Sequence, residues 1–132
     1  MLSPRLAVAL RRGHVDIANL RGRPTVINFF ASYCAPCKEE GPLLAEQAAD
    51  LAGRVTFLGI AYQDFRSDAR RLLKKSHASY PCLYDGPGNT ASAWGLTGIP
   101  ETFVLDSRTR VVAHILGRIS KRQLEEAIKA AA

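Results

Sequence analysis

Continuous apolar runs alternate along the chain with segments whose apolar residues recur at helical spacing. Residues 25–31 (TVINFFA) and 55–62 (VTFLGIAY) are mostly apolar runs of strand length, which is typical of strands buried on both faces of a sheet. Between the two runs the apolar side chains lie three or four residues apart, and Gly53 follows where a helix would end. This order predicts two central strands connected by a helix.

The middle of the chain continues with a helix and a short strand. Residues 67–77 (SDARRLLKKSH) return to helical spacing, with Ser67 as the N-cap candidate. Residues 82–84 (CLY) form a brief apolar run, followed by the turn cluster DGPGN and by a short helical segment, residues 90–96, that ends at a glycine. The first two thirds of the chain therefore alternate between strand and helix.

The C-terminal third follows a different order. Residues 101–106 (ETFVLD) and 111–116 (VVAHIL) are strand-like and separated by the four polar residues SRTR, so we expect an antiparallel hairpin. Ser120 and Gln123 have the spacing of a capping box at the start of a last amphipathic helix.

The element order predicts an α/β fold with a mixed central sheet and helices on both of its faces. Near the N-terminus, residues 5–10 (RLAVAL) and 14–20 (HVDIANL) predict an additional β-hairpin. With 132 residues, of which 47% are hydrophobic, the chain is long enough for one core, and we expect a single domain over residues 1–132.

Composition narrows the classes of function. The net charge of +6 comes from basic residues dispersed over several segments, and the densest stretch, RRLLKK, is typical of the solvated face of a helix. No stretch interleaves basic residues with base-stacking aromatics, so we expect no nucleic-acid binding. No run of about 18 apolar residues is present that would span a bilayer.

Two cysteines, Cys34 and Cys37, lie two residues apart between the first apolar run and the helix that follows it. A structural zinc site needs about four ligands, and the remaining candidates are isolated in the sequence: Cys82, His14, His77 and His114. A disulfide between the pair would close a very small loop and add little stability, which disfavours a purely structural bridge. The spacing instead favours a redox centre.

The predicted helix start gives the two sulfurs different chemistry. Unpaired N–H groups and the helix dipole at Cys34 favour its thiolate, which lowers its pKa and makes Cys34 the attacking sulfur. Cys37, one turn further along, is the resolving thiol. Pro36 fits the first turn of a helix, where a missing N–H costs nothing.

The segments NFFASYCAPCKEEGP (residues 28–42) and GIPETFVLD (residues 98–106) together resemble the thioredoxin superfamily, specifically its TlpA, ResA and DsbE (CcmG) branch of extracytoplasmic thiol–disulfide oxidoreductases. The resemblance covers nearly the whole chain and implies a thioredoxin fold with a TlpA-type helical insertion. It implies that Pro100 is cis and lies beside the cysteine pair, so that the backbone of Ile99 can pair with a substrate segment like an added strand.

The resemblance also assigns roles to other side chains. Glu40 matches a glutamate that tunes the pKa values of the cysteines and their proton transfer, and the alternative is a solvated residue stabilising the helix start. Glu101 matches the DsbE (CcmG) type, the alternative being a solvent-facing strand residue. The implied catalytic residues are Cys34, Cys37, Glu40 and Pro100, and the implied substrate-binding residues are Tyr33, Pro36, Ile99 and Glu101.

Three positions depart from the patterns of the superfamily. Asn28 replaces the buried aspartate of cytosolic thioredoxins, as in the ResA and TlpA type, which argues against general disulfide reduction in the cytosol. Tyr33 stands where tryptophan is usual. Cys82 is outside the pattern, and we expect it to be a small core residue rather than a third redox thiol.

The function that the resemblance implies is reduction of protein disulfides outside the cytoplasm, with apocytochrome c haem-site cysteines as an example of a substrate. It further implies a membrane thiol-electron donor, a monomer, no cofactor beyond the Cys34–Cys37 disulfide, and a secretory signal or anchoring helix upstream of Met1. Two alternatives stay open: a disulfide donor for secreted proteins, because small free-energy differences set the redox direction, and a metal-binding module that uses the CxxC thiolates.

Overall fold

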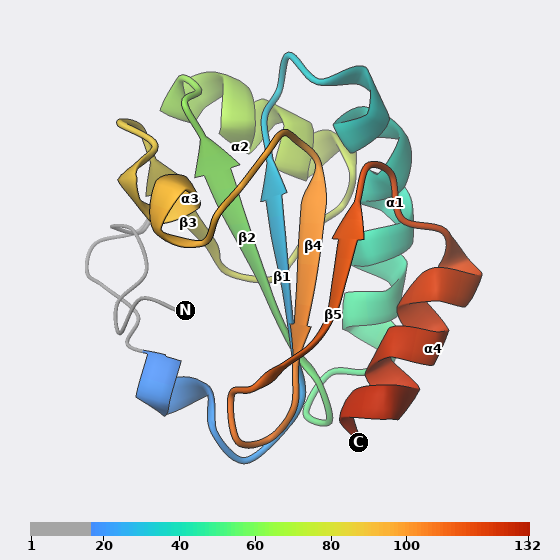
Figure 1. Ribbon diagram of the computed structural model, residues 1–132. Helices are drawn as coiled ribbons and strands as arrows, with labels where there is room; N and C mark the ends of the chain where they lie inside the picture. Colours follow the sequence, from blue (N-terminus) through green and yellow to red (C-terminus); the bar gives the residue numbers. More distant parts are fainter. Residues whose placement is uncertain (1–16) are drawn as a thin grey trace.

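The computed structural model describes residues 17–132, which form a five-stranded mixed sheet with helices on both faces (Figure 1). The strand order is β3-β2-β1-β4-β5. The first three strands in this order pair in parallel, whereas β4 runs antiparallel to both β1 and β5. This is the α/β sheet predicted from the sequence, with the first apolar run, β1, at its centre.

The elements follow the predicted order. Their bounds along the chain are a 3-10 helix η1 (Ile17–Leu20), β1 (Thr25–Phe30), α1 (Ala35–Asp50), β2 (Thr56–Tyr62), α2 (Arg66–Lys75), β3 (Cys82–Asp85), α3 (Asn89–Ala93), β4 (Glu101–Leu105), β5 (Val111–Leu116) and α4 (Lys121–Ala131). Helix α2 lies between α1 and β4 in the chain order, where the resemblance implies a helical insertion. The capping box of α4 is present, since Ser120 and Gln123 exchange both hydrogen bonds.

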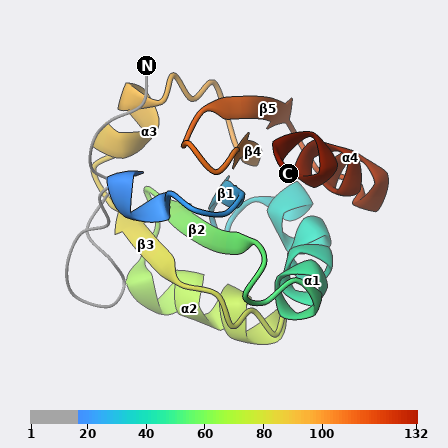
Figure 2. The same cartoon turned by 90° about the horizontal axis from the view of Figure 1, so that it is seen from below.

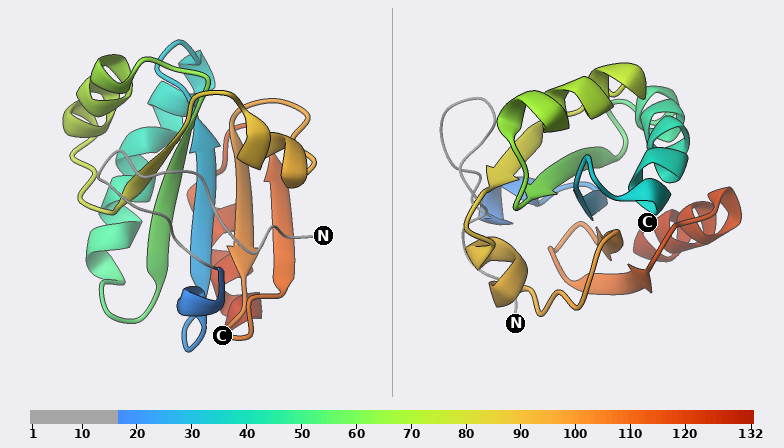
Figure 3. Two further views of the ribbon diagram at one scale, coloured as in Figure 1. Left: turned by 90° about the vertical axis from the view of Figure 1, so that its left-hand side faces the viewer. Right: turned by 90° about the horizontal axis from the view of Figure 1, so that it is seen from above.

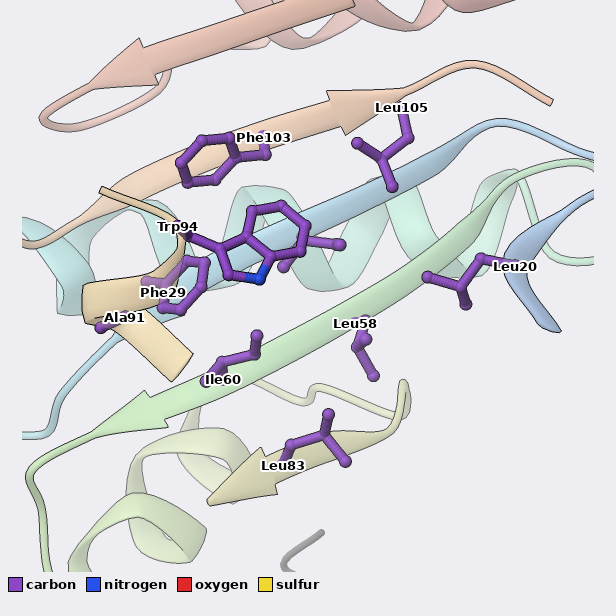
Figure 4. Packing of buried hydrophobic residues seen from close by; sticks show 10 residues of the cluster. Leu20, Phe29, Leu58, Ile60, Leu83, Ala91, Trp94, Phe103 and Leu105 are labelled. Atoms are coloured by element: carbon purple, nitrogen blue, oxygen red, sulfur yellow. The ribbon is translucent and has the colours of Figure 1, made fainter. Parts of the chain in front are cut away.

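Helices α1, α2 and α4 lie on one face of the sheet, and α3 lies on the other (Figure 2). Side chains of β1 alternate between the two faces, so that Val26 packs toward α1 and α4 while Ile27 and Phe29 pack toward α3. On the α3 side, Trp94 meets Phe103 edge-to-face and Phe29 in a tilted ring contact (Figure 4). Burial on both faces explains why β1 reads as an almost continuous apolar run.

Two expectations differ from the structure. Most of the predicted N-terminal hairpin lies outside the described residues, and its last four residues, Ile17–Leu20, form a 3-10 helix rather than a strand. Helix α2 begins at Arg66 with Phe65 as its N-cap and not with Ser67. The N-cap lies two residues earlier than predicted because the preceding Asp64 carboxylate accepts the backbone N–H of Phe65.

Within residues 17–132 no helix combines the length and the apolar character that a bilayer crossing requires. The loop after β1, the start of α2 and the loop before β4 all lie at the same end of the sheet (Figures 1 and 3). The parallel strands β1 and β2 end there with their carboxyl termini. This end of the sheet therefore brings together segments that are distant in the sequence.

Candidate active site

Cys34 and Cys37 form a disulfide at the start of α1, with Cα atoms 5.2 Å apart. Cys34 is the N-cap, in an extended conformation, and its sulfur accepts the backbone N–H of Cys37 at 3.2 Å. Its carbonyl begins the helix by accepting the N–H of Lys38. The side chain that caps the helix is thus the sulfur itself, which places a hydrogen-bond donor and the positive helix end against Cys34.

The two sulfur-bearing residues differ in exposure. Cys34 is 8% exposed and Cys37 is 3% exposed. Pro36, between them, is exposed and occupies the first turn of α1, as predicted. The more exposed of the two residues is therefore the one whose thiolate the helix terminus favours, which agrees with Cys34 attacking and Cys37 resolving.

The peptide bond between Ile99 and Pro100 is cis, as the resemblance implies. Ile99 is half-buried and packs against the hydrophobic cluster that contains both cysteines. The carbonyl of Pro100 accepts the N–H of Gly117 at 2.9 Å. The structure thus brings Cys34, Cys37, Ile99 and Pro100 into one place from two halves of the chain.

Glu40 is buried, with 1% of its surface exposed, and not solvated as the alternative reading had it. One of its carboxylate oxygens accepts the side-chain N–H of Asn28 at 2.7 Å, and the other accepts the backbone N–H of Ile119 at 3.0 Å. Burial raises the pKa of Glu40, against the lowering effect of these two hydrogen bonds and of Arg118. A carboxyl group that protonates more readily than usual thus lies one turn along α1 from Cys37.

Glu101, the first residue of β4, is 2% exposed and makes four polar contacts. Its Oε1 accepts the N–H and the hydroxyl of Thr97 and the N–H of Gly98, at 2.7–3.0 Å. Its Oε2 lies 2.7 Å from His114 Nε2 on β5. Burial alone would raise the pKa of Glu101, but the bonds from His114 and Thr97 hold it below its usual range. The solvent-facing alternative is wrong, because the carboxylate points into the loop that carries the cis-proline.

Asp64, at the end of β2, holds the loop before the disulfide and was not found by sequence reasoning. Its Oδ2 accepts the Ser32 N–H at 2.7 Å, and its Oδ1 accepts the Ser32 hydroxyl and the Phe65 N–H, each at 2.8 Å. Next to Ser32, Tyr33 is 62% exposed and donates to the Tyr62 carbonyl at 3.4 Å. An acidic residue two positions after a buried strand, at the carboxyl end of a parallel sheet, was the available signal.

Cys82, on β3, lies outside the Cys34–Cys37 disulfide and is 7% exposed. Its sulfur faces Gly59 of β2, where an added Cβ would lie 2.8 Å from it. The sulfur fills space that the glycine leaves open, which fits the expected packing role.

His114 lies flat on Phe103, with ring centroids 4.1 Å apart. In residues 17–132, no three metal-ligating side chains are grouped closely enough to hold an ion.

Two grooves adjoin the disulfide loop. One, of about 370 Å³, runs from Tyr33 and Tyr62 to the cis-proline loop and has no charged residue in its lining. The other, of about 420 Å³, lies between α1 and α2. Its lining includes Ser32, Lys38 and Lys75. Both volumes fall in the range of clefts that hold ligands.

The sequence matches the Redoxin family over residues 4–130, and the chain belongs to this family. It is 33% identical over 112 residues to the thiol:disulfide interchange protein CycY of Rhizobium leguminosarum bv. viciae, which covers 84% of this chain and 59% of that protein. It is also 33% identical over 112 residues to the thiol:disulfide interchange protein DsbE of Xylella fastidiosa strain Temecula1, covering 84% of this chain and 56% of that protein.

A solved structure gives the same assignment. The thiol:disulfide interchange protein, thioredoxin family protein, from Chlorobium tepidum TLS superposes with a TM-score of 0.84 at 29% identity, covering 99% of this chain and 95% of that chain. The thioredoxin fold and the similarity to DsbE-type proteins are therefore confirmed. The chain spans little more than half the length of these curated relatives, 59% and 56%.

Proposed function

We propose that this protein is a thiol–disulfide oxidoreductase that reduces disulfides of protein substrates outside the cytoplasm. The observation that carries the proposal is the Cys34–Cys37 disulfide at the N-terminus of α1, with the Cys37 N–H on the Cys34 sulfur. The names of the relatives support it, since they are thiol:disulfide interchange proteins. The finer proposal, carried over from the resemblance, is that the substrates include the haem-site cysteines of apocytochrome c.

The reaction begins from the reduced protein. The Cys34 thiolate attacks one sulfur of a substrate disulfide, a mixed disulfide forms, and the other substrate sulfur leaves as a thiolate. Cys37 then loses its proton and attacks the Cys34 sulfur, which releases the second substrate thiolate. The substrate gains two electrons and the protein ends with the Cys34–Cys37 disulfide. A membrane thiol-electron donor would restore the dithiol by the same two exchanges.

The surrounding groups divide the work. The N–H of Cys37 and the helix terminus stabilise negative charge on Cys34 when it is the thiolate or the leaving group. Glu40, one turn beyond Cys37, takes the proton that Cys37 loses, for which a pKa raised by burial is suited. Its charge, when present, disfavours thiolates nearby, and this favours the reductant over the disulfide donor. Glu101 holds the loop that presents Ile99 to the substrate.

The Cys37→Ser variant tests the assignment of the two sulfurs. It lacks the resolving thiol, so incubation with a disulfide-bonded peptide should accumulate a mixed disulfide through Cys34, visible as an added mass that dithiothreitol removes. Cys82→Ser is the matched control and should complete the reaction without accumulating the adduct. Adduct formation that persists in Cys34→Ser would contradict the proposal.

The direction of the reaction follows from the reduction potential of the pair. Equilibration with a glutathione or dithiothreitol series, read by thiol alkylation, should give a value near that of thioredoxin, about −270 mV. A value near that of DsbA, about −120 mV, would instead identify a disulfide donor.

A further inference from the structure

The groove between α1 and α2 is basic, unlike the one beside the cis-proline loop. Lys38, Arg71 and Lys75 line it together with one carboxylate, Asp68, for a net lining charge of +2. Asp68 pairs with Arg71 at 3.0 Å. Within residues 17–132, Lys38 and Lys75 have no ion-pair partner. The groove thus presents cationic groups that the fold itself does not neutralise.

The apolar part of this groove comes from Pro42 on α1 and Leu72 on α2. Basic residues at its rim and apolar side chains within it suit a chain segment that combines carboxylates with apolar side chains. The surface of α2 extends the positive field, because the helix RSDARRLLKK carries five basic residues and one acidic residue. A cleft of about 420 Å³ can enclose a peptide segment, whereas a flat lipid surface would not enter it.

The groove adjoins the redox centre through the chain itself. Ser32 precedes Cys34 by two residues and Lys38 follows Cys37 directly, and both line the groove. The uncharged groove adjoins the same loop through Tyr33. A substrate bound at Cys34 can therefore place one flank in the uncharged groove beside Ile99 and the other flank in the basic groove between α1 and α2. Only the basic groove selects for the charge of the flank that it holds.

We infer that the groove between α1 and α2 binds an acidic, extended segment of the protein that exchanges its disulfide with Cys34. The inference rests on the proposed function and adds the chemistry of the partner: carboxylates within a few residues of the reacting cysteine, facing Lys38, Arg71 and Lys75. Pairing of these charges at the surface is screened by salt, so the selection is strongest at low ionic strength.

The test uses three synthetic peptides with one identical internal disulfide and flanks of glutamate, serine or lysine. The reduced protein is mixed with each peptide, quenched by alkylation and analysed by mass, and kcat/KM is compared between peptides for the same protein. The glutamate peptide should exceed the lysine peptide by about tenfold at low salt, and high salt should abolish most of the difference. Using a ratio within one protein cancels any change in the intrinsic reactivity of Cys34.

Charge reversal in the groove, K38E/R71E/K75E, should invert the preference, and the neutral variant K38Q/R71Q/K75Q should remove it. The control K121E/R122E/K129E makes the same change in net charge on α4 and should keep the preference of the unmodified protein. Thermal unfolding of each variant verifies that the fold is retained, and the neutral variant carries the test if the reversed one does not fold.

Two results would overturn the inference while leaving the proposed function intact. One is equal kcat/KM for the three peptides, and the other is an equal loss of preference in the α4 control, which would show an effect of net charge alone. Sedimentation with phosphatidylserine vesicles that requires Lys38, Arg71 and Lys75, together with no preference among peptides, would assign the groove to membranes instead. Failure to exchange with any peptide would refute the proposed function itself, and the inference with it.

Discussion

Glu101 divides its contacts so that two substitutions should have very different costs. All three donors from the cis-proline loop reach Oε1, whereas Oε2 meets only His114. In Glu101→Gln, the amide oxygen can take the place of Oε1 and keep the donors from Thr97 and Gly98. The amide nitrogen then faces the ring nitrogen of His114, which can accept in its neutral form. Glu101→Ala removes every contact.

The expected costs follow from the kind of bond that is lost. Hydrogen bonds to a charged group contribute about 1.5–3 kcal/mol each and neutral ones about 1 kcal/mol, and donors that share one oxygen do not add fully. Glu101→Gln should therefore lower the free energy of unfolding by about 1–2 kcal/mol near neutral pH. Glu101→Ala leaves the N–H groups of Thr97 and Gly98 without their acceptor and should cost about 3–4 kcal/mol.

The cost should depend on pH in a defined direction. The pKa of Glu101 in the folded protein lies below its ordinary value, so its ionised form stabilises the fold. This stabilisation is fully present above the ordinary pKa of glutamate and is lost as the pH falls through the lowered folded-state value. The difference between the unmodified protein and Glu101→Gln should therefore shrink toward acid pH.

Urea unfolding of the oxidised proteins, followed by circular dichroism over a pH series, measures these differences. Exchange kinetics with a disulfide peptide provide the functional readout, since a loosened loop should lower kcat/KM in Glu101→Ala more than in Glu101→Gln. Equal destabilisation by the two substitutions, or a Glu101→Gln difference that grows toward acid pH, would refute the assignment of Glu101 as an ionised anchor of the loop.

Three further substitutions test other parts of the structure. Burial raises the pKa of Glu40, so its protonated form stabilises the fold below the ordinary glutamate pKa, and this stability is lost as the pH rises through the raised value. Glu40→Gln cannot ionise, so its free energy of unfolding should lack this loss when unfolding is measured over a pH series. The same pH profile in Glu40→Gln and the unmodified protein would contradict the prediction. Asp64→Asn should lower the free energy of unfolding by about 1–2 kcal/mol and slow peptide exchange. Both carboxylate oxygens of Asp64 accept hydrogen bonds from Ser32, so the amide nitrogen of asparagine would face a donor. Unfolding and exchange rates equal to those of the unmodified protein would contradict this prediction. Gly59→Ala should lower the free energy of unfolding by about 1–3 kcal/mol, because the added Cβ meets the Cys82 sulfur. In the double variant, Cys82→Ala should recover part of this loss. Strictly additive effects of the two substitutions would refute the contact.

Much of the fold could be predicted from local patterns. The central strands, the C-terminal hairpin and the capping box at Ser120 were all readable, because each depends on side-chain periodicity or on residues within one turn. The start of α2 was placed wrongly at Ser67, because a carboxylate outside the helix, Asp64, fixes the backbone there. The Asp64 side chain also accepts hydrogen bonds from Ser32, which is distant in the sequence. Its position therefore depends on the tertiary structure and could not be predicted from local propensity.

The sequence by itself determined the chemistry of the site: two cysteines spaced for one helical turn, with a proline between them, need only local geometry to form a redox pair. The tertiary structure decided how that pair is surrounded. Asn28 on β1 and the backbone of Ile119 hold the buried Glu40 carboxylate, and the pairing of β4 with β5 sets His114 beside Glu101. Burial and hydrogen bonding to distant residues shift the pKa values of these carboxylates, and neither is encoded in the spacing of residues along the chain.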